Sequence, residues 1–382
     1  MENNDSVCFI NKITNIEKIE NAEKIELATV NGWKSIVPKD SIKVGDIILC
    51  IVTDAVIPEA FGAKHGILNY LRKGNRVKTI KLKGVYSDCI IIPLDNLKTE
   101  LEDFYTPGIG WDCLDNGQDM MKFLEIFKYE EPEKLVILPG GRRIKQKDNP
   151  NFNKYYKFPN IKNVPNIFNE FDEVVTTRKI HGSNARYGIV KKAKITLLDR
   201  IKKWFGNEWI DYEYVYGSHN VIKGSDVNGF YSTDIWKTVA DRENLKSKLW
   251  EVAKMLGKSN LGKGIIFYGE VYGPGIQGEK YSYNLKEIEV AFFDVEMNGQ
   301  YLNRDNFEFV TKVFKTVPVL YRGLYSIEII NSLVNNQFIE GTKIPHEGIV
   351  CSAISGERQK VAKFINPDYL IFAEKHIVPD GH

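Results

Sequence analysis

Short polar clusters in the second half of the chain stand at the ends of apolar segments. The first contains Lys179, which is followed by His181 and Gly182 between two strand-like segments. A lysine beside a glycine that admits a ligand to the backbone can act as a covalent nucleophile. Four later clusters each place one charged residue among large apolar neighbours: Glu270, Asp294, Glu347 and Lys363. Charged side chains are rarely buried unless they are paired or bind metal or phosphate, so these clusters indicate a shared ligand.

Several familiar nucleotide-binding motifs are missing. The chain has no GxxxxGK[ST] segment, no HExxH segment and no kinase catalytic loop. Residues 273–278 match GxGxxG only formally, because Pro274 interrupts the motif and no apolar helix follows. We interpret that segment as a turn.

The elements that position these clusters mix strands and helices without regular βαβ alternation. Apolar alternation predicts strands at 173–180, 184–190, 213–218, 264–273, 289–297, 347–353 and 361–365. Helical spacing predicts helices at 232–256 and near 305–315. This pattern indicates an α+β domain with largely antiparallel sheets over residues 168–382.

The first part of the chain reads as short strands with turn signals between them. The expected strands are 7–13, 24–30, 34–38, 45–53, 76–82 and 87–94, with turns at Asn31-Gly32 and Lys83-Gly84. This spacing predicts a small antiparallel β-barrel, for which an oligonucleotide/oligosaccharide-binding (OB) barrel is the natural candidate. An amphipathic helix at 119–130 is expected to close a domain that spans residues 1–140. A β domain that only packs and binds nothing is the alternative.

Composition excludes several classes of protein. The 382 residues are 43% apolar and 27% charged with a net charge of +2, which fits a soluble globular chain of two domains. Residues 1–150 carry a net charge of −2 and residues 151–382 carry +4, so we expect anionic ligands in the later part. Five scattered cysteines argue against disulfides and structural zinc and favour a reducing, intracellular compartment. We expect neither a signal peptide nor a membrane span.

Residues 141–167 combine basic and aromatic side chains and are interpreted as a linker. Seven bases fall between Arg142 and Lys162, and four aromatic residues are interleaved with them: Phe152, Tyr155, Tyr156 and Phe158. Bases for phosphates and aromatic rings for stacking are typical of RNA-binding surfaces, although a charge run is often only a solvated loop. A second basic run, from Lys191 to Lys203, carries the same interpretation with less support.

The clusters resemble five motifs of one superfamily. KIHGSN, FYGEVYG, FFDV, EGIV and VAKF are similar, in order and in spacing, to motifs I, III, IIIa, IV and V of the covalent lysine nucleotidyltransferases. This superfamily includes ATP-dependent RNA and DNA ligases and mRNA capping enzymes. The spacings are 91, 24, 53 and 16 residues. One such match is weak, but five collinear matches are strong.

The first domain also resembles the N-terminal OB-like domain of one group of RNA ligases. DNA ligases and capping enzymes place an OB domain after the nucleotidyltransferase domain, whereas only 19 residues follow Lys363 here. The resemblance therefore implies an ATP-dependent RNA ligase that joins 3′-OH and 5′-phosphate RNA ends through a lysyl-AMP intermediate. A capping-type or DNA-ligase-type transferase and a non-catalytic RNA-binding protein remain as alternatives.

The resemblance assigns roles to residues of this chain. It implies that Lys179 is the nucleophile and that Lys363 and His181 assist catalysis. The residues it implies for ATP binding are Lys179, Ile180, Asn184, Glu270, Phe293, Ile349, Lys363 and Lys162. Glu347 and Glu270 are expected to hold Mg²⁺ or Mn²⁺. For RNA binding the resemblance implies His219, and the basic and aromatic pattern of the linker adds Arg142, Arg143, Lys145 and Tyr155.

Three positions depart from the family pattern. His181 stands where this group more usually has aspartate, motif V has one lysine where many relatives have two, and His219 lies where relatives often present arginine. The implied partners are ATP and RNA with no membrane, and we expect a monomer.

Overall fold

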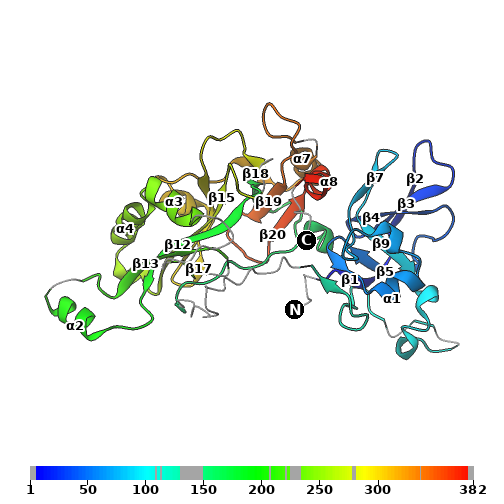
Figure 1. Ribbon diagram of the computed structural model, residues 1–382, viewed down its shortest axis with the longest axis horizontal. Helices are drawn as coiled ribbons and strands as arrows, with labels where there is room; N and C mark the ends of the chain where they lie inside the picture. The colour runs from blue at the N-terminus through cyan, green and yellow to red at the C-terminus, as the bar shows by residue number, and fades with distance from the viewer. Residues whose placement is uncertain are drawn as a thin grey trace, which may run out of the picture. The chain divides into compact units, whose positions relative to one another are not determined.

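The computed structural model describes residues 6–107, 110–111, 114–129, 149–205, 208–219, 222–223, 234–277, 281–335 and 337–376, which form two compact units (Figure 1). The first contains the described residues up to 129 together with 159–167, and the second contains 149–158 and 168–376. The expected linker is therefore divided between the units where it is described. No helix within these ranges is long and apolar enough to cross a membrane.

The first unit is a small antiparallel β domain, as predicted. Its described strands are β1 (Cys8–Lys12), β2 (Asn15–Lys18), β3 (Ile25–Val30), β4 (Trp33–Pro38), β5 (Ile47–Val52), β6 (Ala55–Val56), β7 (Ile80–Leu82), β8 (Val85–Ser87), β9 (Cys89–Pro93) and β10 (Phe127–Lys128), with the short helix α1 (Glu59–Lys64). β5 lies between β1 and β9 and is almost wholly buried, which explains its continuous apolar sequence. Asn31 has a φ of 52° in the predicted two-residue turn between β3 and β4.

The predicted helix at 119–130 is wrong within its described part, which ends at residue 129. Residues 121–125 form turns and Glu125 has a φ of 54°, a left-handed conformation that an α-helix does not contain. Met120, Leu124 and Ile126 are nevertheless buried in the core of the β domain. The helix-like spacing of these apolar residues therefore arises because the turns bury them in the core, not because they line one face of a helix.

The second unit contains two antiparallel sheets, which confirms the α+β prediction. One has the order β14-β13-β12-β15-β16-β17 and the other has the order β18-β11-β19-β20. Their bounds are β11 (Glu173–Lys179), β12 (Ser183–Lys191), β13 (Tyr212–Gly217), β14 (Ile222–Lys223), β15 (Gly264–Tyr272), β16 (Glu289–Met297), β17 (Gln300–Tyr301), β18 (Val319–Leu324), β19 (Gly348–Ala353) and β20 (Val361–Ile365).

The helices described in the second unit are α2 (Leu197–Trp204), α3 (Ile235–Arg242), α4 (Leu245–Leu256), α5 (Lys258–Leu261), α6 (Arg304–Val310), α7 (Ile327–Val334) and α8 (Pro367–His376). Of these, α3 and α4 lie beside the six-stranded sheet, whereas α2 projects away from it (Figure 1). The helix expected at 232–256 is two helices, because Asn244 adopts a φ of 53° between α3 and α4. Val239 of α3 and Leu249 of α4 pack with Tyr187 of β12 in the main core of this unit.

Candidate active site

Lys179 is the last residue of β11 and lies beside a carboxylate that directly precedes the neighbouring strand. The register pairs Lys179 with Gly348, so Glu347 precedes β19 at the same level. The Lys179 Nζ atom lies 2.6 Å from Glu347 Oε1. Burial alone would lower the pKa of Lys179, but the charges of Glu347 and Glu270 outweigh burial and raise it. In this state the lysine is an ammonium ion.

Gly182 lets the chain cross closely from β11 to β12. A Cβ atom at this position would clash with the carbonyl oxygen of Val271 and lie 2.9 Å from the Glu270 Cγ atom. The sequence KIHGSN therefore needs glycine at its fourth position for a steric reason. This close crossing holds Lys179 of one sheet near Glu270 of the other.

Glu270 lies on β15 opposite Asn184 on β12. Burial raises the pKa of Glu270 to about 8; Lys179 opposes this shift and Glu347 adds to it. The Asn184 Oδ1 atom is buried and has no hydrogen-bonding partner among the described residues. An orphaned buried acceptor next to a carboxylate and a lysine is a polar position that suits a ligand with a donor group.

A pocket of about 240 Å³ extends from Lys179 between the two sheets. Its aromatic wall is formed by Phe293, Tyr155 and Phe158, and its aliphatic wall includes Val175 and Val350. The Phe293 and Tyr155 rings meet edge to face with centroids 5.0 Å apart. Such a slot, apolar on both walls and polar at its end, suits a flat heteroaromatic ring attached to a charged group.

The aromatic wall depends on a buried arginine. Arg186 of β12 is 2% exposed and donates hydrogen bonds to the carbonyl oxygens of Phe152 and Asn153, at 3.0 and 2.9 Å. These bonds fix the segment that carries Tyr155 and Phe158 against the six-stranded sheet. Burial lowers the pKa of Arg186 to about 10, which leaves it charged at neutral pH. Sequence reasoning did not single out this residue.

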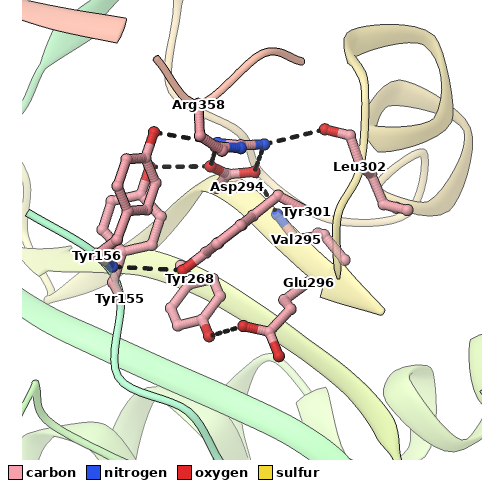
Figure 2. Close-up of polar contacts among 9 residues, drawn as sticks. All are labelled: Tyr155, Tyr156, Tyr268, Asp294, Val295, Glu296, Tyr301, Leu302 and Arg358. Carbon is pink, nitrogen blue, oxygen red and sulfur yellow. Dashed lines mark hydrogen bonds and ion pairs between the residues drawn. The ribbon is translucent and has the colours of Figure 1, made fainter. Parts of the chain in front are cut away.

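Arg358 and Asp294 also line the pocket, and Figure 2 shows their side chains facing one another as an ion pair. Arg358, from the connection between β19 and β20, contacts both Asp294 carboxylate oxygens and donates to the carbonyl oxygen of Leu302 at 3.2 Å. Tyr155 also donates its hydroxyl to Asp294, at 2.9 Å. Burial raises the pKa of Asp294, and Arg358 opposes this shift. The Arg358–Asp294 ion pair joins the two sheets. Asp294 was singled out from the sequence, but Arg358 was not.

His181 is held by tyrosines. Its backbone N–H donates to the Tyr283 hydroxyl at 2.7 Å, and its Nδ1 atom lies 2.9 Å from the Tyr369 hydroxyl. Burial lowers the pKa of His181; Lys179 adds to this effect, while Glu347 and the backbone of Gln277 oppose it. The imidazole is therefore neutral at neutral pH, unlike the aspartate more usual in the resembling group.

The remaining residues that were expected to bind ATP do not all face the pocket. Lys363 on β20 pairs in register with Val350, which lines the pocket, so its side chain is on the pocket face of the sheet. Ile180 is buried and lines the pocket. Ile349 is buried and, as the neighbour of Val350 in the strand, points to the opposite face. Lys162 lies in the first unit, where it pairs with Asp88.

The predicted RNA-binding residues are only partly described. Arg142, Arg143 and Lys145 lie outside the described residues. Tyr155 is in the wall of the pocket, with its hydroxyl bound to Asp294, rather than on an exposed surface. His219 follows the end of β13.

Two carboxylates near Lys179, those of Glu270 and Glu347, could hold a cation together. Within the described ranges, no group of three or more His, Cys, Asp or Glu side chains is arranged to hold a metal ion. Glu270 and Glu347 face one ammonium group, and their mutual repulsion contributes to the raised pKa of Glu270. This excess of negative charge favours an additional cation when both carboxylates are ionised.

Solved structures of an RNA ligase from Naegleria gruberi share this fold. An aspartate-to-alanine mutant without ligand matches with a TM-score of 0.70 and 20% identity, over 97% of this chain and 99% of that chain. A lysine-to-alanine mutant with ATP and Mn matches with a TM-score of 0.69 and 21% identity over the same shares. A glutamate-to-alanine mutant with AMP and Mn gives 0.70 and 21%, also over 97% and 99%. At this identity the likeness shows the fold alone.

Family comparisons cover both units. A family model for an OB-fold domain matches residues 7–94, which confirms the predicted OB barrel. The family model for RNA ligases matches residues 172–365, just over half of the chain, and this range contains all five motifs. No match was found among curated proteins. The chain, with its OB-fold domain followed by two sheets that meet at Lys179, belongs to the RNA ligase family.

Proposed function

We propose that this protein is an ATP-dependent RNA ligase that joins RNA 3′-OH and 5′-phosphate ends. The observation that carries the proposal is the position of Lys179. Its amine lies 2.6 Å from Glu347, and Lys179 lines the same pocket as Glu270 and Phe293. Family membership supports RNA as the substrate. The ATP and AMP complexes of the Naegleria gruberi enzyme support an adenine nucleotide as the co-substrate.

In the first step the Lys179 amine attacks the α-phosphorus of ATP. A P–N bond forms, the bond to the bridging oxygen breaks, and pyrophosphate leaves. The amine must first lose its proton, and Glu347 is the group that holds that proton in a hydrogen bond. Lys363, on the pocket face of its sheet, supplies positive charge that favours both a neutral amine and a negatively charged phosphate.

The pocket fits the nucleotide that this step needs. The adenine ring would stack on Phe293 between the two apolar walls, with the phosphates directed toward Lys179. Asn184 offers its orphaned Oδ1 as an acceptor for a ribose hydroxyl. A divalent cation held by Glu270 and Glu347 would neutralise charge at the α-phosphate.

Two further transfers complete ligation. A 5′-phosphate oxygen of RNA attacks the lysyl-AMP phosphorus, so the P–N bond breaks and Lys179 is released as an amine. The 3′-OH of the other end then attacks the activated 5′-phosphorus, a phosphodiester forms and AMP leaves. Recognition of the ribose 2′-OH near the junction would distinguish RNA from DNA.

The test is covalent labelling with ATP or GTP that carries a labelled α-phosphate, with Mg²⁺ and with Mn²⁺. We expect an acid-labile AMP adduct on the wild type and none on Lys179→Ala. Lys315→Ala, which removes a lysine paired with Glu289 outside the pocket, serves as the matched control and should keep the adduct. An adduct that persists in Lys179→Ala refutes the assigned nucleophile. A GMP adduct without an AMP adduct refutes the choice of ATP.

A further inference from the structure

Residues 192–205 and 208–211 belong to an arm that is inserted between β12 and β13 of the second unit. The backbone N–H of Lys192 donates to the carbonyl oxygen of Asp211 at 2.9 Å and closes the root of the arm. Helix α2 lies near the outer end of these strands, apart from α3 and α4 (Figure 1). We refer to residues 192–205 and 208–211 as the α2 arm.

The polar side of α2 is fixed to the root of the arm. The Asp199 carboxylate accepts hydrogen bonds from the Thr196 backbone N–H and hydroxyl, at 2.9 and 2.7 Å, and the Thr196 hydroxyl caps the Asp199 N–H. Lys192 Nζ lies 2.7 Å from the other Asp199 oxygen. These partners lower the pKa of Asp199. The only acidic residue between Lys191 and Phe205 is therefore already neutralised by an ion pair.

The apolar side of α2 faces solvent. Leu197, Ile201 and Trp204 recur at helical spacing, and Phe205 follows at the end. Trp204 is 83% exposed and Phe205 is 76% exposed, with ring centroids 5.2 Å apart. An amphipathic helix ordinarily buries this face against its own domain. A helix that instead fastens its polar side and exposes two adjacent aromatic rings indicates a binding surface.

The described part of the arm and its root carry exposed cations, together with one exposed acid, Glu208. Arg200 lies on α2 one turn before Trp204, and Lys191 and Lys194 lie near the root of the arm; all three are exposed. Exposed aromatic rings together with cations match the chemistry of a single nucleic-acid strand, whose bases stack and whose phosphates are anionic. An anionic membrane surface would also attract cations, but the family acts on RNA.

We propose that the α2 arm binds unpaired nucleotides of the RNA substrate at a distance from the reaction centre. This inference rests on the proposed function. β12 leads from Asn184 at the pocket to Lys191 at the root of the arm, which is roughly 23 Å of extended strand. Only an RNA strand that extends several nucleotides beyond the junction can reach Trp204, so the contribution of the arm depends on substrate length.

The test compares RNA binding by arm variants on short and long substrates. Fluorescence anisotropy would measure the affinity for 5′-phosphorylated single strands of about four and about twenty nucleotides. We expect Trp204→Ala to weaken binding of the long strand about fivefold or more and to leave the short strand unchanged. Arg200→Ala should reduce the salt dependence for the long strand by about one phosphate contact.

Two variants control for general effects. Phe171→Ala removes a ring that is 79% exposed elsewhere in the same unit, and Lys254→Ala removes an exposed base on α4. Both should bind either strand like the wild type. The proposal is overturned if Trp204→Ala weakens both lengths equally or neither. It is also overturned if Trp204→Ala abolishes binding to phosphatidylserine vesicles while long-strand affinity is unchanged.

Adenylylation separates failure of this inference from failure of the proposed function. The arm variants should form the AMP adduct at the wild-type level, because the arm does not line the pocket. A wild type that forms no adduct refutes the proposed function. Normal adduct formation with no length-dependent loss in Trp204→Ala refutes only the role of the arm.

Discussion

Replacing Arg358 with methionine should destabilise the second unit more than an ordinary ion-pair mutation. The substitution keeps a long side chain but leaves Asp294, which is 7% exposed, without its cationic partner. Removing one partner of a buried ion pair costs about 3–5 kcal/mol. Because the Arg358 side chain is 27% exposed, we expect the lower end, about 3 kcal/mol. For a unit of this size that is a fall in Tm of roughly 6–12 °C.

The loss should depend on pH with a definite sign. Burial raises the pKa of Asp294 above its unfolded value, and Arg358 opposes that rise. Without Arg358 the folded-state pKa rises further, so the folded protein penalises the ionised carboxylate. This penalty is full above the new pKa and disappears as the pH falls toward the unfolded value. The stability difference between Arg358→Met and wild type should therefore narrow in acid.

Calorimetry at several pH values would measure these effects against a matched control. Arg322 pairs with Asp305 at 2.9 Å in the same unit, but their side chains are 45% and 74% exposed, so Arg322→Met should cost less than about 1 kcal/mol. Adding Asp294→Asn to Arg358→Met should recover part of the loss, because it removes the unpaired charge. The reasoning is refuted if Arg358→Met costs no more than Arg322→Met, or if the double variant loses the sum of the single variants.

Three other substitutions test separate features. Gly182→Ala should cost about 1–3 kcal/mol of stability and abolish adduct formation, because its Cβ collides with the Val271 carbonyl; unchanged denaturation and labelling would contradict this. Glu270→Gln should become more stable than wild type as the pH rises from about 4.5 to 8, because burial penalises the ionised carboxylate of the wild type. The difference in stability should level off above pH 8, and equal denaturant curves at pH 8.5 would disprove it. Lys162→Met leaves Asp88, whose side chain is 3% exposed, without its ion-pair partner, so the free energy of unfolding of the first unit in urea should fall by about 3 kcal/mol. Lys34→Met breaks an exposed ion pair of 3.9 Å and should change that free energy little.

The fold was predictable where one physical rule acts alone. Alternating or continuous apolar runs located the longer strands, and the Asn31-Gly32 turn fixed the register of β3 and β4. The prediction failed where tertiary packing decides the backbone. Asn244 divides one helical pattern into α3 and α4, and Glu125 turns back a segment whose apolar residues are buried in a barrel. Neither residue type forbids a helix in isolation, so the local pattern gave no warning.

The candidate site was predictable from the spacing of its motifs but not from composition alone. Lys179 ends β11, whereas Glu270 and Phe293 lie within β15 and β16, and all three line one pocket. Arg358 was not predicted because its partner is 64 positions away in the sequence. The connection between β19 and β20 that carries Arg358 also has no recognisable sequence pattern. Arg186 was missed because a buried arginine bound to carbonyl oxygens resembles, in sequence, any charged residue of a strand.

The ion pair between Lys179 and Glu347 exists only while the lysine is a free ammonium. Once a phosphoramidate forms, one positive charge disappears at this position and one negative phosphate is added beside two carboxylates. The site of the covalent intermediate is therefore more negatively charged than the site of the resting protein, and it attracts cations more strongly. Retention of a cation at this site should then be greatest after Lys179 has been adenylylated and before AMP is transferred to RNA, when an anionic RNA end has to approach the same place.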